Sequence, residues 1–440
     1  MPGLVLALDP ADAPRLARLP GLHPARARGT TLAWHDTPDG ALAARGTALQ
    51  VRAGVWTLER LHPPSVLATA ARRDGLGLPG TLAPVARQAG TARTLTGAGV
   101  TLDLLRLPAG CSLTLGGDPD AVAALASTLA RDLSAHVPRR GLAATVLGTP
   151  HEPPAEPVVH PDRSVGENLA GIVAALLDST LRWSDEIPAA IGPEPVHQMR
   201  VAIRRLRSAL SVFKAAVPEP LLGRVQPGLK YLAARLGTAR DWDVFLSGLG
   251  AELRTAFPDD RRCRTLLRAA DRRRHQCYAE VRALLAGPEF RVLTVDLACM
   301  AALRPWPDGG AIEPFARRVL DGRLRTVRKR GRAFADLPLP ALHELRKKAK
   351  RLRYTAEFMA PFFPPKPGRR FIRRIAALQD ELGHLNDGAT TTGLVGQLGR
   401  LERSYAAGLV EGFAAARAAP ARKEAQQAWK QLRDAKPFWR

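Results

Sequence analysis

The sequence is poor in the residues that build disulfide frameworks and metal sites. Its 440 residues include four cysteines, Cys111, Cys263, Cys277 and Cys299, which are too few and too scattered for a disulfide framework. His275 lies close to Cys277, but residues two apart on a helix point to opposite sides. The sequence therefore predicts no metal site and no cofactor.

Long apolar runs and aromatic residues are also scarce. No stretch of about 18 apolar residues occurs, so we expect no transmembrane helix. The first residues lack a basic segment followed by an apolar one, so we expect no signal peptide and a cytoplasmic protein. Aromatic residues make up 5% of the chain, which argues against stacking on single-stranded nucleic acid, and no helix-turn-helix or zinc-finger pattern stands out. Non-specific contacts to phosphates are the mode of nucleic-acid binding that remains.

Positive charge, by contrast, is abundant and unevenly distributed. The formal net charge is +24. Residues 1–160 contain 15 arginines, no lysine and 12 acidic residues, whereas residues 161–440 contain 50 basic and 29 acidic residues. This asymmetry predicts a polyanionic partner for the second part of the chain. A GC-rich genome, which favours Arg and Ala, would account for a share of the excess without any partner.

A proline-rich segment divides the chain into two differently patterned regions. Five of the twelve residues from 150 to 161 are proline, so we expect an extended linker at 150–162. Before it, residues 1–149 alternate short apolar runs with turn signals, which predicts a small, mainly β module of the α+β type. Its predicted strands are 47–51, 54–58 and 100–104, and its predicted helix is 119–133.

The region after the linker contains an internal repeat. The sequence H-Q-M-R-V-A-I-R-R-L-R begins at His197, and H-E-L-R-K-K-A-K-R-L-R begins 146 residues later at His343. The segment L-G-T-A-R-D that ends at Asp241 is matched by L-G-H-L-N-D, which ends at Asp387, at the same offset of 146. Two matches in one register indicate a duplicated helical unit. We therefore expect an all-α domain at 163–420, built of two similar four-helix bundles.

Helical periodicity runs through this whole domain. We expect the first bundle at about 163–300, the second at about 310–420, and a basic tail at 421–440. Two predicted helices end at the glycines of the L-G motifs, Gly237 and Gly383. The predicted helices are 166–185, 195–216, 220–237, 241–255, 260–286, 290–304, 314–335, 340–361, 368–383 and 388–418.

The duplicated segments each carry an apolar seam with a basic stripe beside it. The seam residues are Val196, Met199, Ile203, Leu206, Leu210 and Phe213 in the first copy, and Leu342, Leu345, Ala349, Leu352 and Met359 in the second. The stripe follows one residue later, with His197, Arg200, Arg204, Arg207 and Lys214 in the first copy, and His343, Arg346, Lys350 and Arg353 in the second.

The position of the stripe matters more than its charge. One residue turns a helix by about 100°, so the stripe borders the seam and points into the groove between packed helices. Like charges held there repel one another unless an anion lies between them. The pattern thus predicts an anion site. The alternative is a solvated basic face whose long side chains cover apolar surface.

Further cations are predicted to extend the anion site. They are Arg224 and Lys230 in the first copy, and Arg325, Arg328, Arg332, Arg370, Arg373 and Arg374 in the second. Because the first copy holds fewer of them, we expect the second half of the cleft to be more positive. Asp241 and Asp387 are expected to pair with an arginine or to cap a helix, and so to hold the cleft open.

The repeated motifs resemble those of the CHAD family over residues 163–420. The resemblance rests on V-H-Q-M-R-V-A-I-R-R-L-R, on L-H-E-L-R-K-K-A-K-R-L-R-Y-T-A-E-F, and on the two L-G-x-x-x-D segments. It implies two pseudo-symmetric four-helix bundles with a central basic cavity. It also implies binding of inorganic polyphosphate, often at polyphosphate granules. The residues that match the family's two basic helices are His197, Arg200, Arg204 and Arg207, and His343, Arg346, Lys350 and Arg353.

Residues 34–60 resemble part of a CYTH triphosphate-tunnel domain, a familiar companion of CHAD. The family's first strand reads Glu-x-Glu-x-Lys and holds a divalent metal, whereas this chain has L-V-L-A-L at Leu4 to Leu8. Gln50 replaces an expected arginine, and Thr101 stands where a carboxylate would be useful, although Asp103 is retained. Metal-dependent triphosphate hydrolysis lacks its carboxylates here. The resemblance implies a decayed tunnel that serves as a scaffold or as a weak anion site formed by Arg45, Arg52, Arg60, Arg87 and Arg93.

Binding of inorganic polyphosphate in a basic cleft between the two bundles is the leading hypothesis. Arginine binds phosphate oxygens with a planar fork of donors, and lysine adds a point charge. We expect a binding protein rather than an enzyme, cytoplasmic or at polyphosphate granules. Two alternatives stay open, a metal-dependent triphosphatase in the first module and non-specific binding of nucleic acid. The sequence leaves the oligomeric state open.

Overall fold

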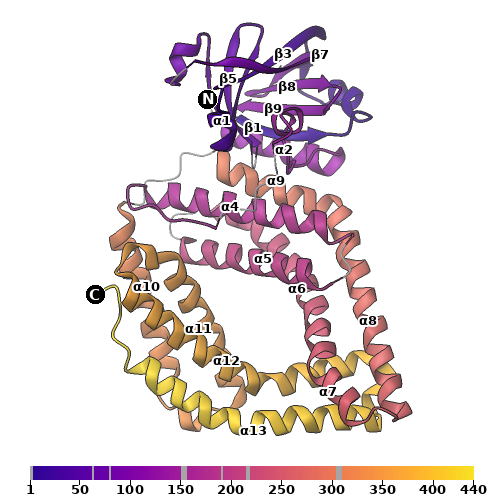
Figure 1. The fold of residues 1–440 in the computed structure, drawn as a ribbon, viewed down its shortest axis with the longest axis vertical. Helices are drawn as coiled ribbons and strands as arrows, with labels where there is room; N and C mark the ends of the chain where they lie inside the picture. Colours follow the sequence, from indigo (N-terminus) through magenta and orange to yellow (C-terminus); the bar gives the residue numbers. More distant parts are fainter. Residues whose placement is uncertain are drawn as a thin grey trace.

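A computed structural model describes residues 3–61, 64–78, 81–149, 156–189, 192–214, 219–303 and 310–440. A β-barrel formed by the N-terminal part of the chain sits on a larger region of long helices (Figure 1). The fold class predicted from the sequence, a mainly β module followed by an all-α domain, is confirmed. Among the described helices, none is long and apolar enough to cross a membrane.

Eight antiparallel strands form the barrel. Their order is β7-β3-β4-β5-β6-β1-β9-β8, and the pairing of β7 with β8 closes the ring. The strands are β1 (Gly3–Leu8), β3 (Arg28–Asp36), β4 (Thr47–Arg52), β5 (Val55–Leu61), β6 (Pro64–Ala70), β7 (Ala83–Gly97), β8 (Val100–Leu107) and β9 (Gly110–Gly117), and the two-residue β2 (His23–Pro24) pairs with β7. The three predicted strands correspond to β4, β5 and β8.

Two hairpins of the barrel turn through the same dipeptide. Ala53 and Gly54 join β4 to β5 with φ values of 48° and 81°, and Ala98 and Gly99 join β7 to β8 with φ values of 47° and 75°. Positive φ at both loop residues is the backbone of a type I′ turn, whose twist matches that of the flanking strands. These turns set the register of the strands that line the barrel.

Short helices complete the barrel. The helix α2 (Pro119–Asp132), predicted from the sequence, begins at Asp118, whose carboxylate accepts hydrogen bonds from the amides of Asp120 and Ala121. The helix α3 (Leu142–Val146) packs against β4 and β9, and its Ala143 and Ala144 join a buried cluster with Leu32 and Trp34. A further short helix is α1 (Ala41–Ala44). One end of the barrel interior is therefore filled by apolar side chains.

The helical region consists of two bundles. The first contains α4 (Val165–Glu186), α5 (Glu194–Val212), α6 (Glu219–Ser247) and α9 (Pro288–Ala302), and it is extended by α7 (Leu249–Ala256) and α8 (Arg261–Ala286). The second contains α10 (Ile312–Arg330), α11 (Leu339–Met359), α12 (Pro365–Val395) and α13 (Tyr405–Arg433). A shift of 146 residues superposes α4, α5 and α6 on α10, α11 and α12 to within two residues at each end.

Several predicted boundaries are wrong. The predicted helix 388–418 covers the end of α12, a 3₁₀ segment and the first part of α13. The predicted helix ends at Gly237 and Gly383 do not exist, because α6 and α12 continue through both glycines. The predicted tail at 421–440 is not separate either. Most of it belongs to α13, and Trp439 is buried, packs edge-on against Phe371 and donates a hydrogen bond to Asp321. Aromatic packing therefore anchors the end of the chain to the second bundle.

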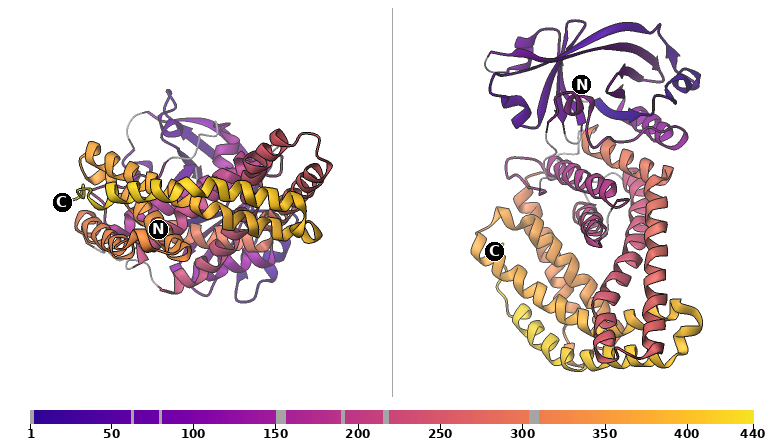
Figure 2. Two further views of the ribbon diagram at one scale, coloured as in Figure 1. Left: turned by 90° about the horizontal axis from the view of Figure 1, so that it is seen from below. Right: turned by 45° about the vertical axis from the view of Figure 1, so that its right-hand side comes forward.

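The barrel is attached to the first bundle through α2 and α9, which pack against each other (Figure 2). Arg224 of α6 reaches this contact. Its Nη2 lies 2.7 Å from Oδ1 of Asp296 on α9 and 2.6 Å from the hydroxyl of Ser127 on α2. That hydroxyl also donates to Asp296 Oδ1 at 2.6 Å. Asp296 and Ser127 are both 6% exposed, so these bonds form a buried polar latch between the barrel and the bundle.

Candidate functional site

The two basic helices meet where the bundles join. In α5 and α11, which pack against each other, every predicted seam residue is buried. Seven of the predicted stripe residues, each directly after a buried seam residue, are half-buried, as expected for residues that border the seam. These half-buried residues are His197, Arg200 and Arg204 of α5, and His343, Arg346, Lys350 and Arg353 of α11.

Five of these side chains form one group, which we call the cation cluster: Arg200, Arg204, Arg346, Lys350 and Arg353. The charges of the other four members all act on the amine of Lys350. Burial, together with the charges of the four arginines, lowers the pKa of Lys350 from 10.5 to about 8. Burial also lowers the pKa of Arg204, with Arg200 and Arg353 adding to the effect. The cluster thus brings cations from both copies of the repeat within electrostatic reach of one another.

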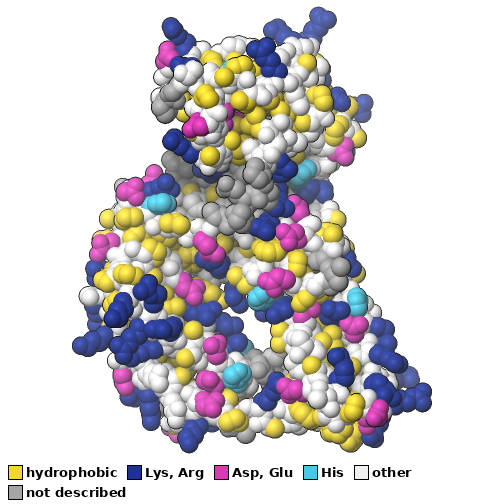
Figure 3. All heavy atoms as spheres, viewed as in Figure 1, with side chains coloured by type: hydrophobic (Ala, Val, Ile, Leu, Met, Phe, Trp, Pro, Cys, Tyr) yellow, Lys and Arg dark blue, Asp and Glu magenta, His cyan; other side chains and the backbone are white. Residues whose placement is uncertain are grey.

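A cavity of about 330 Å³ opens beside the cluster. It lies between α5, α6, α11, α12 and α13, and Figure 3 shows the helical region hollowed at this level. Four of its lining side chains are cationic, namely Arg200, Arg346, Lys350 and Arg417. The carboxylate among its described lining residues is Asp241. Three of the four cations come from the second copy, but none of the residues on which the predicted imbalance rested lines the cavity.

The glycines of the two L-G motifs make room for the arginines of the cluster. A Cβ at Gly237 would lie 2.6 Å from Nη1 of Arg200, and a Cβ at Gly383 would lie 3.2 Å from Nη2 of Arg346. These two glycine–arginine pairs are related by the 146-residue shift. The motif therefore does not end a helix. It lets a guanidinium lie against the backbone of the neighbouring helix.

Asp241, the aspartate of the first L-G motif, faces the cluster. Its Oδ1 lies 3.9 Å from Nη2 of Arg200, so the predicted pairing with an arginine is present. Burial raises the pKa of Asp241, and the charges of Arg200 and Lys350 oppose that rise. The corresponding side chain of Asp387 lies outside the described residues. The two described carboxylates beside the cluster, Asp241 and Glu357, are fewer than its five cations, so the described part of the cluster keeps a net positive charge.

An aromatic ring holds two of the cations in place. The guanidinium carbons of Arg204 and Arg353 lie 5.3 Å and 5.4 Å from the ring centre of Tyr354. Arg353 also forms an ion pair with Glu357, with Nε 3.4 Å from Oε1. The Nε of Arg204 and the hydroxyl of Tyr354 are buried without a hydrogen-bond partner among the described residues. Buried donors of this kind are ready to bind an acceptor supplied by a ligand.

The other predicted cations lie elsewhere. Arg224 belongs to the latch with Asp296, and Arg328 donates hydrogen bonds to the carbonyls of Arg433 and Ala435 at the end of α13. Arg374 is half-buried but does not line the cavity. The exposed residues that also do not line it are Arg207, Lys214, Lys230, Arg325, Arg332, Arg370 and Arg373. The site is thus smaller than the sequence predicts.

Arg417 is the cavity cation that the sequence did not reveal. It lies on α13 and forms an ion pair with Glu252 of α7, which joins the second bundle to the first across the cavity. Its neighbours in the sequence are mostly alanines, so no basic stripe marks it.

The predicted histidines flank the cluster rather than forming its centre. His197 is half-buried, and burial lowers its pKa, with the positive charge of Arg240 as the next cause. A lowered pKa keeps His197 neutral at pH 7, so we expect it to contribute as a hydrogen-bond donor rather than as a cation. His343 is also half-buried.

The barrel interior holds one of its five predicted arginines. A cavity of about 400 Å³ is lined by Arg52, Gln50 and Asp103, and Arg52 lies 2.6 Å from Oδ2 of Asp103. The half-buried Arg93 donates to the carbonyl of Ala25. Arg45, Arg60 and Arg87 are exposed, and none of the three lines this cavity. The predicted anion site of the barrel therefore has one arginine, and a carboxylate already neutralises it.

We expect Lys350→Met to stabilise the protein by about 1–2 kcal/mol at pH 7, a figure reduced to allow for the partial exposure of the side chain. The pKa of Lys350 is lower in the folded state than in the unfolded state. Its charge therefore destabilises the fold fully below about pH 8, and the cost disappears as the pH rises toward 10.5. Denaturant unfolding at pH 7 and pH 10 measures this. The wild type should gain stability relative to the variant at the higher pH.

Lys347→Met is the matched control, because Lys347 is exposed on the same helix. It should change the free energy of unfolding by less than about 0.5 kcal/mol. A Lys350→Met protein that is less stable than the wild type would show that the cluster is not electrostatically strained.

This chain is similar to known proteins in sequence and in structure. A family model described as the CHAD domain matches residues 171–396. Two uncharacterised proteins from strains of Mycobacterium tuberculosis are each 33% identical over 217 residues, and the match spans 47% of this chain and 39% of each relative. The crystal structure of the CHAD domain from the plant Ricinus communis is similar, with a TM-score of 0.54 and 26% identity over 65% of this chain and 98% of that one. PptA from Streptomyces chartreusis has a TM-score of 0.48 and 18% identity over 61% of this chain and 99% of that one.

Proposed function

The chain belongs to the CHAD domain family, and from that premise we propose that its cation cluster binds inorganic polyphosphate. The observation that supports this best is the position of Lys350. Its pKa is lowered to about 8 by burial and by the surrounding arginines, so the unliganded cluster carries an electrostatic cost. A bound polyanion would remove that cost, because each phosphate brings negative charge between the two helices.

Polyphosphate suits the composition of the cluster. It is a linear anion without bases or sugars, so a protein recognises it by charge and spacing alone. Arg200 and Arg204 would bind it from α5, while Arg346, Lys350 and Arg353 would bind it from α11. Guanidinium forks donate two hydrogen bonds to phosphate oxygens, and the amine of Lys350 adds a compact charge. A protein with such a site would gather at polyphosphate granules.

The two alternative functions have less support. The exposed arginines of α10 and α12 suit non-specific contacts with nucleic acid, but they lie on the surface and not in the cavity. For the barrel we propose no reaction, because its lumen arginine, Arg52, is paired with Asp103.

Gly237→Ala tests the site without removing a charge. The new methyl group would displace the guanidinium of Arg200, which lies 2.6 Å from the position of the Cβ. We expect polyphosphate affinity to fall about tenfold, which corresponds to the loss of one charge-assisted hydrogen bond. Alanine favours a helix over glycine by about 1 kcal/mol, so the variant should be at least as stable as the wild type. Isothermal titration with long-chain polyphosphate measures the affinity.

Gly223→Ala is the matched control on the same helix. A Cβ at Gly223 meets nothing within 4 Å. This variant should bind polyphosphate as the wild type does. Equal binding by the Gly237 and Gly223 variants would place the polymer away from Arg200.

A further inference from the structure

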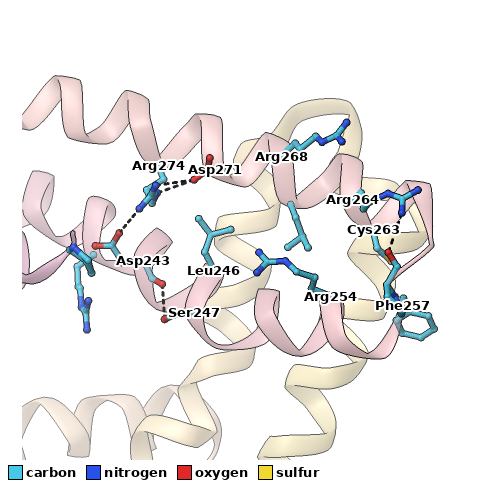
Figure 4. A pocket seen from close by; sticks show the side chains of 14 residues that line it. Asp243, Leu246, Ser247, Arg254, Phe257, Cys263, Arg264, Arg268, Asp271 and Arg274 are labelled. Carbon is cyan, nitrogen blue, oxygen red and sulfur yellow. Dashed lines mark hydrogen bonds and ion pairs between the residues drawn. The ribbon is translucent and has the colours of Figure 1, made fainter. Parts of the chain in front are cut away.

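A second cavity, of about 640 Å³, lies between α6, α7 and α8 (Figure 4). Its volume is in the range of sites for small organic ligands. The segment 249–286 that forms α7 and α8 corresponds, after the 146-residue shift, to a 3₁₀ segment (Gly396–Arg403) and the single helix α13. The second bundle therefore has no equivalent pair of helices. This cavity belongs to the first bundle alone and is not a copy of the cation cluster.

The cavity is lined by an excess of cations. Arg264 donates to the carbonyl of Pro258, and Arg274 is held by Asp271 with Nη2 3.0 Å from Oδ1. By contrast, Arg240, Arg254 and Arg268 form no hydrogen bond or ion pair with the described residues. Figure 4 shows the Arg254 side chain pointing into the cavity toward Leu246. Arg240 acts electrostatically on the carboxylate of Asp243, whereas Arg254 and Arg268 have no counter-charge among the described residues. Two such arginines beside one cavity favour an anionic ligand.

Besides the arginines, the cavity is lined by apolar side chains and by a buried carboxylate. Leu246 and Leu267 line it, so part of the ligand contacts apolar surface. Asp243 also lines the cavity and is 5% exposed. Its Oδ2 accepts a hydrogen bond from the hydroxyl of Tyr278, and its Oδ1 lies 3.7 Å from Arg274 but accepts no hydrogen bond from the described residues. A buried carboxylate oxygen with a free position favours a ligand that carries an N–H or O–H donor.

We propose that this cavity binds a nucleoside polyphosphate. Its phosphates would contact Arg254 and Arg268 at the open side, its base would pack on Leu246 and Leu267, and an amino or hydroxyl group would donate to Oδ1 of Asp243. A bare phosphate chain satisfies only the first of these three contacts. The ligand class therefore differs from that of the cation cluster, and the two sites are independent.

The test is isothermal titration of the full chain with ATP, adenosine and tripolyphosphate in the absence of divalent metal. ATP should bind at least tenfold more tightly than tripolyphosphate or adenosine, because it alone makes all three kinds of contact. Arg254→Ala should weaken ATP binding about tenfold or more, since it removes a charge-assisted hydrogen bond. Arg272→Ala, an exposed arginine of α8 that does not line the cavity, should bind ATP as the wild type does.

Two results would overturn the proposal. One is equal affinity for ATP and tripolyphosphate in Arg204→Ala/Lys350→Ala, where the cation cluster no longer competes for phosphate chains, because equal affinity there would mean that the cavity responds to charge only. The other is loss of ATP binding in Arg204→Ala/Lys350→Ala, which would place ATP in the cation cluster. If ATP binding persists in that double variant while polyphosphate binding is lost, the two sites are separate. If polyphosphate fails to bind the wild type and ATP still binds, the proposed function fails and the nucleotide site stands.

Discussion

Replacing Arg204 and Lys350 together with alanine should weaken polyphosphate binding by about a hundred- to ten-thousandfold. Each side chain offers a charge-assisted hydrogen bond, which contributes about 1.5–3 kcal/mol, and about 1.4 kcal/mol corresponds to a factor of ten. Arg204 comes from α5 and Lys350 from α11, so the double variant removes one contact from each copy of the repeat. Isothermal titration with long-chain polyphosphate measures the loss, and circular dichroism checks that the helices remain.

The control for this prediction removes the same charge from the barrel. Arg18 and Arg26 are exposed and lie in the N-terminal module, away from the cation cluster. Arg18→Ala/Arg26→Ala should change the affinity by less than about threefold, because exposed charges are screened by salt. Similar losses of affinity in the two double variants would mean that polyphosphate binding depends on the net charge of the chain and not on a defined site.

Arg224→Ala should destabilise the first bundle and its contact with the barrel by about 3 kcal/mol. The substitution leaves the carboxylate of Asp296 buried without its cation, and the loss of one partner from a buried ion pair is strongly destabilising. The hydroxyl of Ser127 would still donate to Asp296, which limits the loss. Denaturant unfolding should show a lower midpoint, and limited proteolysis should cut between the barrel and the helices sooner than in the wild type.

Arg370→Ala is the matched control for the latch, because Arg370 occupies the equivalent position in the second copy. It is exposed and no barrel lies against it, so its removal should change the stability by less than about 0.5 kcal/mol. Equal effects of the two substitutions would contradict the role of Arg224 in joining the barrel to the bundle. Unchanged polyphosphate affinity in Arg224→Ala would confirm that Arg224 stabilises the fold and does not bind the polymer.

The burial pattern at the centre of the candidate site could be predicted from the sequence because helical geometry determines it. Apolar residues spaced three and four apart lie on one face of a helix, and that face packs against the core. Basic residues one position later must therefore lie at the edge of that buried face. This reasoning placed Arg200, Arg204, Arg346, Lys350 and Arg353 correctly at the edge of the buried face. The duplication then required the two stripes to occupy equivalent positions in two bundles.

The outer part of the site could not be predicted because it depends on contacts between distant segments. Arg224 and Arg328 fit the basic pattern, but both are used in structural contacts. Arg224 pairs with Asp296 beside the barrel, and Arg328 donates a hydrogen bond to the carbonyl of Arg433 at the end of α13. Arg417 reaches the cavity from a helix without a basic stripe. The predicted helices 220–237 and 368–383 stop at the L-G motifs, whereas α6 and α12 continue through them and Gly237 gives space to a guanidinium.

Bound polyphosphate should raise the free energy of unfolding of the protein. The same burial that lowers the pKa of Lys350 makes the empty cluster costly, so the bound polymer should stabilise the fold. At a free concentration one hundred times its dissociation constant, a ligand that binds only the folded state adds about 2.7 kcal/mol. The variants that weaken binding should lose this gain while they keep or increase the stability of the free protein.

The most direct test of the central claim compares two polyanions on the wild-type protein. Long-chain polyphosphate and duplex DNA, matched in total phosphate charge, are titrated separately into the chain at physiological ionic strength. A narrow cluster between α5 and α11 should bind the bare phosphate chain at least tenfold more tightly, because a duplex is too wide to enter a cavity of about 330 Å³. Equal affinities for the two polymers would contradict the account and favour a general basic surface.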